Sequence, residues 1–207
     1  PAVRAELGLP VRAPLAVCVA RLSRQKGQDV LLRAWPAVRR GCPAALLALV
    51  GDGPLDGPSP DGVLRVGPVA DPRPWLVAAD VAVFPSRWEG LCLGLLEAMA
   101  VGRSTVVSAI PGLLEVVDHR VGAAVPAGQV GPLADTLLAR LADPALAAAE
   151  GDAAARRAPA FDVQRTHQRV ADLTELALEA HQRPPMSWRS RCAERGLSGH
   201  SNTPCGQ

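Results

Sequence analysis

Short apolar runs that alternate with helical patterns place the strongest constraint on the fold of this 207-residue chain. The run LAVCVA at 15–20 contains no polar alternation, as expected for a strand buried on both faces of a parallel sheet. Comparable runs follow at 45–50, 63–66, 81–85, 105–108 and, more weakly, 122–126. Because strands and helices alternate, the sequence predicts an α/β domain built on a doubly wound parallel sheet.

Helical patterns fill the segments between and after these runs. A helical period after the first run is kept by Val30, Leu31, Ala34, Trp35 and Val38. Further helices are predicted at about 130–141, 144–157 and 162–181. We therefore expect one domain over residues 1–182. Residues 183–207 have few aliphatic side chains and no period, which predicts a disordered tail.

Composition and charge exclude several classes of protein. The formal net charge of +2, without a basic block, gives no indication of nucleic-acid binding. The sequence has neither an apolar run of about 18 residues nor a signal-peptide pattern, so we expect a cytoplasmic protein. Five cysteines without a C-x-x-C pair argue against a disulfide framework and against a zinc site. The chain starts at Pro1 with what looks like the middle of a protein, and we expect a fragment.

Two cations follow the first predicted strand. Arg21 and Lys26 flank a loop that opens a helix, and the free N–H groups of a helix N-terminus attract phosphate. Lys26 is also the only lysine among 22 basic residues, which indicates a site where a compact ammonium is needed. The pair is therefore a candidate for binding a pyrophosphate. The alternative interpretation is two solvated surface charges.

Two carboxylates, Glu89 and Glu97, lie in the otherwise small and apolar segment SRWEGLCLGLLEAMAVG at 86–102. A carboxylate in such surroundings needs hydrogen-bonding or cationic partners, and Arg87 is the only cation close by in the sequence. Glu89 precedes a predicted helix at 93–101. Glu97 lies on its second turn, with little exposed face left by its neighbours. We predict that both carboxylates point toward the carboxyl edge of the sheet and accept hydrogen bonds from sugar hydroxyls. A solvated surface glutamate is the alternative.

At these residues the sequence resembles the C-terminal, nucleotide-sugar-binding domain of retaining glycosyltransferases of family 4. These enzymes have the GT-B architecture of two facing Rossmann-like domains. The motifs lie between about Leu15 and Leu178 and comprise VARLSRQKGQDVLLRAW, LVGDGP, AADVAVFPSRWEG, LLEAMAVG and IPGLLEVV. Glu89 and Glu97 have the family's E-x7-E spacing, and Arg21 and Lys26 its R-x4-K spacing. Their order and spacing together are specific.

The resemblance also implies a role for each candidate residue. Arg21 and Lys26 would bind the diphosphate of a nucleotide-sugar donor. Glu97 would accept the ribose hydroxyls, and Glu89 would face the transferred sugar as the catalytic residue. The backbone N–H groups that would approach the phosphates and the sugar belong to Gly90, Leu91, Cys92 and Leu93. No metal and no other cofactor is expected.

Several positions depart from the family pattern. Cys92 stands where the family usually has glycine, which places a side chain beside the expected phosphate contact and predicts weaker binding there. Residues 55–62 (LDGPSPDG) replace a helix by a short loop, so we expect an open wall near the nucleobase. Ser104 replaces a common proline and Ala109 a frequent aspartate, and we expect only local consequences.

The sequence contains no counterpart of the N-terminal, acceptor-binding domain of this architecture. Positioning two substrates supplies much of catalysis, so we expect the chain alone to be inactive. The acceptor, whether glycan, lipid or small molecule, is not identified, and peripheral membrane association is expected only through the missing domain. The alternative function is a non-catalytic module that binds a nucleotide sugar. A nicotinamide-dependent oxidoreductase is disfavoured because ARLSRQKG, not G-x-G-x-x-G, follows the first strand.

Overall fold

The computed structural model describes residues 2–55 and 57–182. The chain divides into two compact units, of which one ends at Asp162 and the other begins at Val163. The helix predicted at about 162–181 is observed as α8 (Val163–Gln182), which is the described part of the second unit. The tail predicted over 183–207 lies outside the described residues. Among the described residues no helix is long and apolar enough to cross a membrane.

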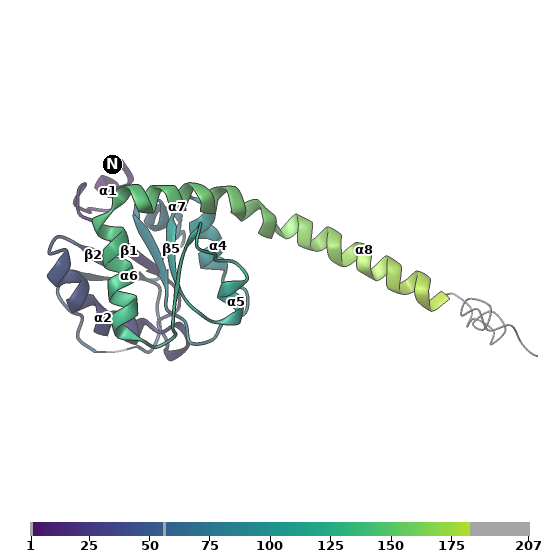
Figure 1. Cartoon of the computed structure of the whole chain (residues 1–207), viewed down its shortest axis with the longest axis horizontal. Coiled ribbons are helices and arrows are strands. Elements are labelled where there is room, and N and C mark those ends of the chain that lie inside the picture. Colours follow the sequence, from purple (N-terminus) through teal and green to yellow (C-terminus); the bar gives the residue numbers. More distant parts are fainter. Residues whose placement is uncertain (1, 56, 183–207) are drawn as a thin grey trace, which may run out of the picture. The chain divides into compact units, whose positions relative to one another are not determined.

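Six parallel strands form one sheet in the first unit (Figure 1). In sequence they are β1 (Leu15–Val19), β2 (Leu46–Val50), β3 (Val63–Gly67), β4 (Val81–Phe84), β5 (Ser104–Ser108) and β6 (Gly122–Val125). Their order across the sheet is β3-β2-β1-β4-β5-β6, which is the order of doubly wound dinucleotide-binding folds. The predicted Rossmann-like α/β fold is therefore confirmed. Each observed strand begins and ends within one residue of the apolar run that predicted it.

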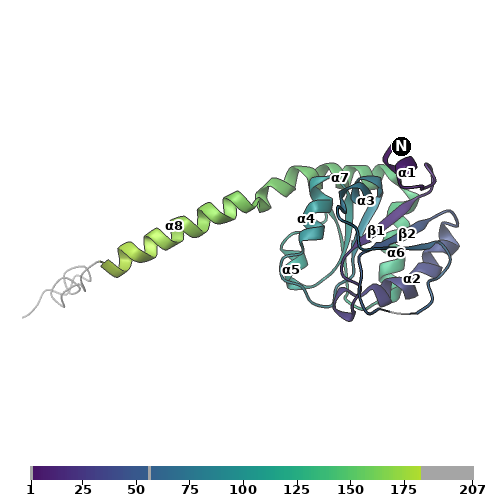
Figure 2. The ribbon, with the colours of Figure 1, turned by 180° about the vertical axis from the view of Figure 1, so that it is seen from behind.

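Helices cover both faces of this sheet (Figures 1 and 2), and a hydrophobic core lies on each face. Alternate residues of β1 serve them, since Val17 packs in one core and Cys18 in the other. One face is covered by α2 (Gln28–Gly41) and α6 (Val130–Ala142). The other core receives side chains from α3 (Arg73–Ala78), α4 (Leu93–Ala100), α5 (Pro111–Leu114) and α7 (Pro144–Arg157). All five periodic residues predicted to face the core from α2 are buried.

Short helical elements complete the first unit. A turn at the start of the chain is α1 (Ala2–Glu6), and the 3₁₀ helices are η1 (Arg24–Lys26) and η2 (Ala158–Phe161). The sequence pattern did not predict α3. The segment after GDGP contains turns and no helix over the described residues 57–62, as expected, and Arg65 holds it through Ser59 Oγ at 2.8 Å and Gly57 O at 3.1 Å.

Ser104 takes part in a buried polar cluster. Its hydroxyl donates to Glu150 Oε2 at 2.5 Å. Arg140 donates to both carboxylate oxygens of Glu150, at 2.6 and 2.9 Å. The three residues are at most 8% exposed, so each charge depends on the other for compensation. Ser104, which stands where the family commonly has proline, thus connects β5 through hydrogen bonds to α7 and, by way of Glu150, to α6.

The loops after β1 and β4 lie next to each other because these strands are neighbours. Gly27 makes their contact possible: it has a φ of 71°, and a Cβ at this position would lie 2.0 Å from the carbonyl oxygen of Pro85. The strand order reverses between β1 and β4, which is the switch point where ligands bind in open α/β sheets. Arg21, Lys26 and Glu89 all lie on these two loops.

Candidate functional site

Lys26 and Glu89 form an ion pair across the two switch-point loops. The ammonium of Lys26, at the end of η1, donates to Glu89 Oε2, and the Ser86 hydroxyl lies 3.4 Å from the same oxygen. The Glu89 side chain is only 9% exposed and that of Lys26 20%. The structure therefore brings together two residues that the sequence assigned to different parts of a ligand. The sequence reasoning had not foreseen that they pair directly.

A second ion pair clamps the same two loops. The Arg87 guanidinium donates to both carboxylate oxygens of Asp29, at 2.6 and 2.7 Å, and to the carbonyl of Arg24 at 2.7 Å. The Arg87 backbone N–H donates to Gln25 O at 2.8 Å. The hydrogen bonds from Arg87 hold the pKa of Asp29 below its ordinary value. This clamp fixes the loop that carries Glu89 onto the segment that carries Lys26.

Arg21 is exposed immediately after β1. Its guanidinium makes no hydrogen bond or ion pair with any residue in 2–55 or 57–182. Its backbone, in contrast, is held by the fully buried Gln28, whose amide donates to Arg21 O at 3.0 Å and accepts from Ser23 N at 3.3 Å. Gln28 is a positioning residue that the sequence reasoning missed; the signal was a polar residue at the start of a helix, directly after a glycine.

The N-terminus of α4 faces the same region and lacks a side-chain cap. The first N–H groups of a helix have no helical carbonyl to bind. In the described part of the chain, no hydrogen bond is donated by the backbone N–H groups of Gly90, Leu91, Cys92 and Leu93. Gly112 of α5 packs closely behind them, since a Cβ there would lie 2.3 Å from Gly90 O. The backbone N–H groups that were predicted to contact phosphate are thus free to donate hydrogen bonds to a ligand, as far as the described residues are concerned.

The side chain of Cys92 was predicted to lie beside the phosphate contact, but the structure places it in the core. It is 5% exposed and belongs to the hydrophobic core under α4. Burial raises the pKa of its thiol, and the charges of Lys26, Glu89 and Glu97 act on it as well. Burial also raises the pKa of the nearby Cys18 to about 12. Both thiols are therefore core groups beneath the site.

Glu97 differs from the prediction that it has little exposed face. It is exposed, on the side of α4 that also carries the exposed Leu93 and Ala100. These positions are three or four residues apart and share one side of a helix. The apolar neighbours that suggested burial, such as Leu95 and Met99, point into the core. The Glu97 carboxylate has no hydrogen bond or ion pair within the described residues, and its charge raises the pKa of Arg73 to a small extent after the main effect of Asp71.

Metal-binding clusters are absent from residues 2–55 and 57–182: no group of three or more His, Cys, Asp or Glu side chains converges there. Arg21 and Lys26, the two cations that the sequence assigned to a ligand, both lie at the carboxyl edge of the sheet. The expectation that no metal or cofactor is needed stays a prediction.

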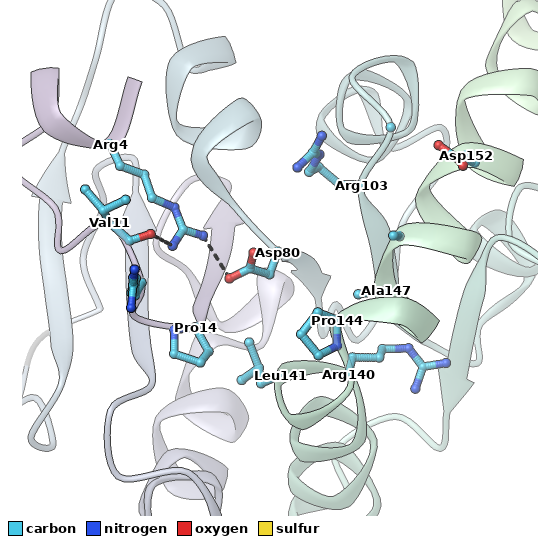
Figure 3. A pocket seen from close by; sticks show the side chains of 13 residues that line it. Arg4, Val11, Pro14, Asp80, Arg103, Arg140, Leu141, Pro144, Ala147 and Asp152 are labelled. Carbon is cyan, nitrogen blue, oxygen red and sulfur yellow. Dashed lines mark hydrogen bonds and ion pairs between the residues drawn. The ribbon is translucent and has the colours of Figure 1, made fainter. Parts of the chain in front are cut away.

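A cavity of about 370 Å³ lies at the opposite, amino edge of the sheet (Figure 3). Its wall contains Arg4, Asp80, Arg103 and Arg140. All four have protein partners: Arg4 pairs with Asp80 at 2.8 Å, Arg140 pairs with Glu150, and Arg103 donates to two backbone carbonyls. This cavity contains none of the predicted site residues, and its charge pairs hold the amino edge together.

The sequence from residue 13 to residue 143 matches the family model described as glycosyl transferases group 1. The chain belongs to this family. It is 33% identical to a D-inositol 3-phosphate glycosyltransferase of Streptomyces avermitilis, over 88% of the chain and 44% of the relative. It is 37% identical to a GDP-mannose-dependent α-(1-6)-phosphatidylinositol monomannoside mannosyltransferase of Mycolicibacterium smegmatis, over 84% of the chain and 50% of the relative. The chain thus spans about half the length of these relatives.

Two solved structures share the fold. A sucrose-phosphate synthase of Thermosynechococcus elongatus matches with a TM-score of 0.74 and 30% identity, over 86% of this chain and 49% of that one. Anabaena HepE, in complex with UDP-glucose, matches with a TM-score of 0.72 and 26% identity, over 84% and 51%. The resemblance found in the sequence motifs is confirmed at the level of the glycosyl transferases group 1 family.

Proposed function

We propose that this chain is the donor-binding half of a nucleotide-sugar-dependent, retaining glycosyltransferase of family 4. The observation that carries the proposal is the convergence of Lys26, Glu89 and the uncapped N-terminus of α4 at the switch point of the sheet. Family membership supports the reaction class, and the UDP-glucose complex of Anabaena HepE supports the kind of ligand.

The roles of the residues follow from their chemistry. Arg21 has an exposed guanidinium that makes no hydrogen bond or ion pair with a described residue, and together with Lys26 it binds the donor's diphosphate. The N–H groups before and at the start of α4 add fixed dipoles that favour negative charge. As the bond between the sugar and the diphosphate breaks, negative charge grows on the leaving diphosphate. Preorganised cations and N–H groups stabilise that charge, which is usually a large contribution to catalysis.

The two carboxylates recognise hydroxyl groups. Glu97, exposed on the side of α4 beside the site, accepts hydrogen bonds from the ribose hydroxyls of the nucleotide. Glu89, in the loop before α4, accepts hydrogen bonds from hydroxyls of the transferred sugar. The exposed Leu91 and Leu93 flank the site and exclude water on one side when a donor is bound.

A thermal-shift panel tests the proposal. The probes are UDP, GDP, UDP-glucose and GDP-mannose, with inorganic phosphate as the control. Ligand at a hundredfold excess over Kd stabilises a protein by about 2.7 kcal/mol, which for a unit of this size raises Tm by roughly 5–10 °C. We expect at least one nucleoside diphosphate and its sugar conjugate to produce this shift, and phosphate to produce none. A panel in which no nucleotide shifts Tm more than phosphate does contradicts the proposal.

A further inference from the structure

The Lys26–Glu89 ion pair joins two charged groups that are both proposed to bind the nucleotide sugar: the ammonium for the diphosphate and the carboxylate for the sugar. Among the residues that the structure describes, the cation paired with Glu89 is Lys26. Because the Glu89 side chain is 9% exposed, water replaces a lost cation poorly there. A buried charge that loses its partner is strongly unfavourable. Lys26 is therefore not freely available to a diphosphate while Glu89 has no substitute partner.

Free nucleoside diphosphate and intact donor differ in what they offer to Glu89. A free diphosphate attracts Lys26 but brings only negative charge, so Glu89 loses its cation and gains repulsion. An intact donor brings sugar hydroxyls that donate hydrogen bonds to the same carboxylate. These bonds compensate Glu89 for the departure of Lys26. The exchange of partners is thus favourable for the sugar-bearing ligand and unfavourable for the bare diphosphate.

We propose that the Lys26–Glu89 ion pair makes the site discriminate between the sugar-bearing donor and the nucleoside diphosphate left after transfer. This inference rests on the proposed function. Once the sugar has left, Glu89 regains Lys26, and the diphosphate keeps mainly Arg21 and the N–H groups of α4. The ion pair therefore weakens the hold on the product and promotes its release.

Glu89→Gln tests the discrimination by calorimetric titration. The variant keeps the length of the side chain but removes its charge, so Lys26 is free to bind phosphate in either ligand. The probes are UDP with UDP-glucose, or GDP with GDP-mannose, whichever pair the wild-type chain binds. We expect affinity for the nucleoside diphosphate to rise about tenfold, because the Glu89 carboxylate no longer competes with the diphosphate for the Lys26 ammonium. Affinity for the sugar conjugate should not rise, so the preference for the donor shrinks or disappears.

Lys26→Gln provides a second test, in which Glu89 is left unchanged. If the exchange operates, this variant loses more affinity for the sugar conjugate than for the nucleoside diphosphate, because only the conjugate gains the full benefit of Lys26. If Lys26 simply binds phosphate in both ligands, both affinities fall by the same factor. Glu6→Gln, which removes an exposed carboxylate on α1, is the control and should change neither affinity.

The outcomes separate this inference from the proposed function. A wild-type chain that binds neither ligand overturns the proposed function, and the inference with it. A wild-type chain that binds both, combined with an unchanged or lower diphosphate affinity in Glu89→Gln, overturns the discrimination alone. Equal losses for both ligands in Lys26→Gln do the same.

Discussion

Breaking the Arg87–Asp29 clamp should weaken donor binding, although neither residue is assigned a contact with the donor. Arg87→Gln removes two charge-assisted hydrogen bonds to Asp29, at 2.6 and 2.7 Å, and one to Arg24 O. Such bonds contribute roughly 1.5–3 kcal/mol when buried. The two side chains are 24% and 34% exposed, so solvent screening lowers this value, and we expect a coupling of about 1–2 kcal/mol. Donor affinity should fall about fivefold to thirtyfold, because the loops that carry Lys26 and Glu89 are then ordered only on binding.

A double-mutant cycle measures this coupling. Arg87→Gln, Asp29→Asn and the double variant are compared by chemical denaturation and by titration with the nucleotide sugar that the wild type binds. Arg120 and Asp118 form a pair in which the arginine side chain is 67% exposed. The cycle of Arg120→Gln with Asp118→Asn is therefore the control, for which little coupling is expected. Effects of Arg87→Gln and Asp29→Asn that add within about 0.3–0.5 kcal/mol, or unchanged donor affinity in all three variants, would refute the reasoning.

Three further predictions concern the site, the core and the thiols. Glu97→Gln should weaken nucleoside diphosphate binding about tenfold to a hundredfold in a titration, since hydrogen bonds to a charged group contribute roughly 1.5–3 kcal/mol. The Tm of the variant should be unchanged. An affinity equal to that of the wild type would show that Glu97 is an ordinary surface residue. Glu150→Gln leaves the buried Arg140 without its counter-charge and should destabilise the first unit by about 3–5 kcal/mol in urea titration; a loss below about 1 kcal/mol would contradict this. Burial raises the pKa of Cys18 from 9.0 to about 12, so the native state binds more protons than the unfolded state between these values. Stability should therefore fall as pH rises through this window, and a Cys18→Ala variant should lose part of that dependence; an identical alkaline slope would falsify the assignment.

The strands and the principal helices could be predicted because their signals are local. The run LAVCVA needs only its own composition to indicate a strand buried on both faces, and Val17 and Cys18 do pack in opposite cores. Alternation of strands and helices, with the ligand edge at the carboxyl ends, then placed Lys26 and Glu89 in one region. In contrast, α3 is only six residues long and contains Pro74, so its period was too short to recognise.

The pairings within the site could not be predicted because they join residues far apart in the sequence. Lys26 and Glu89 are 63 positions apart, and Arg87 and Asp29 are 58 apart. No local pattern encodes which of several charges at one sheet edge will meet. The exposure of Glu97 was predicted wrongly for a related reason. The apolar composition of α4 suggested that every side was covered, whereas only the side with Leu95 and Met99 packs in the core, and the side with Leu93 is open.

Amide hydrogen exchange, with and without the nucleotide sugar that stabilises the chain best, tests the central claim most directly. We expect the ligand to slow exchange in residues 21–28 and 86–96, at the carboxyl edge of β1 and β4. We expect no change around Arg4, Asp80 and Arg103, which line the cavity at the amino edge. Protection centred on that cavity, with unchanged exchange in the loops of Lys26 and Glu89, would contradict the assignment of the donor site.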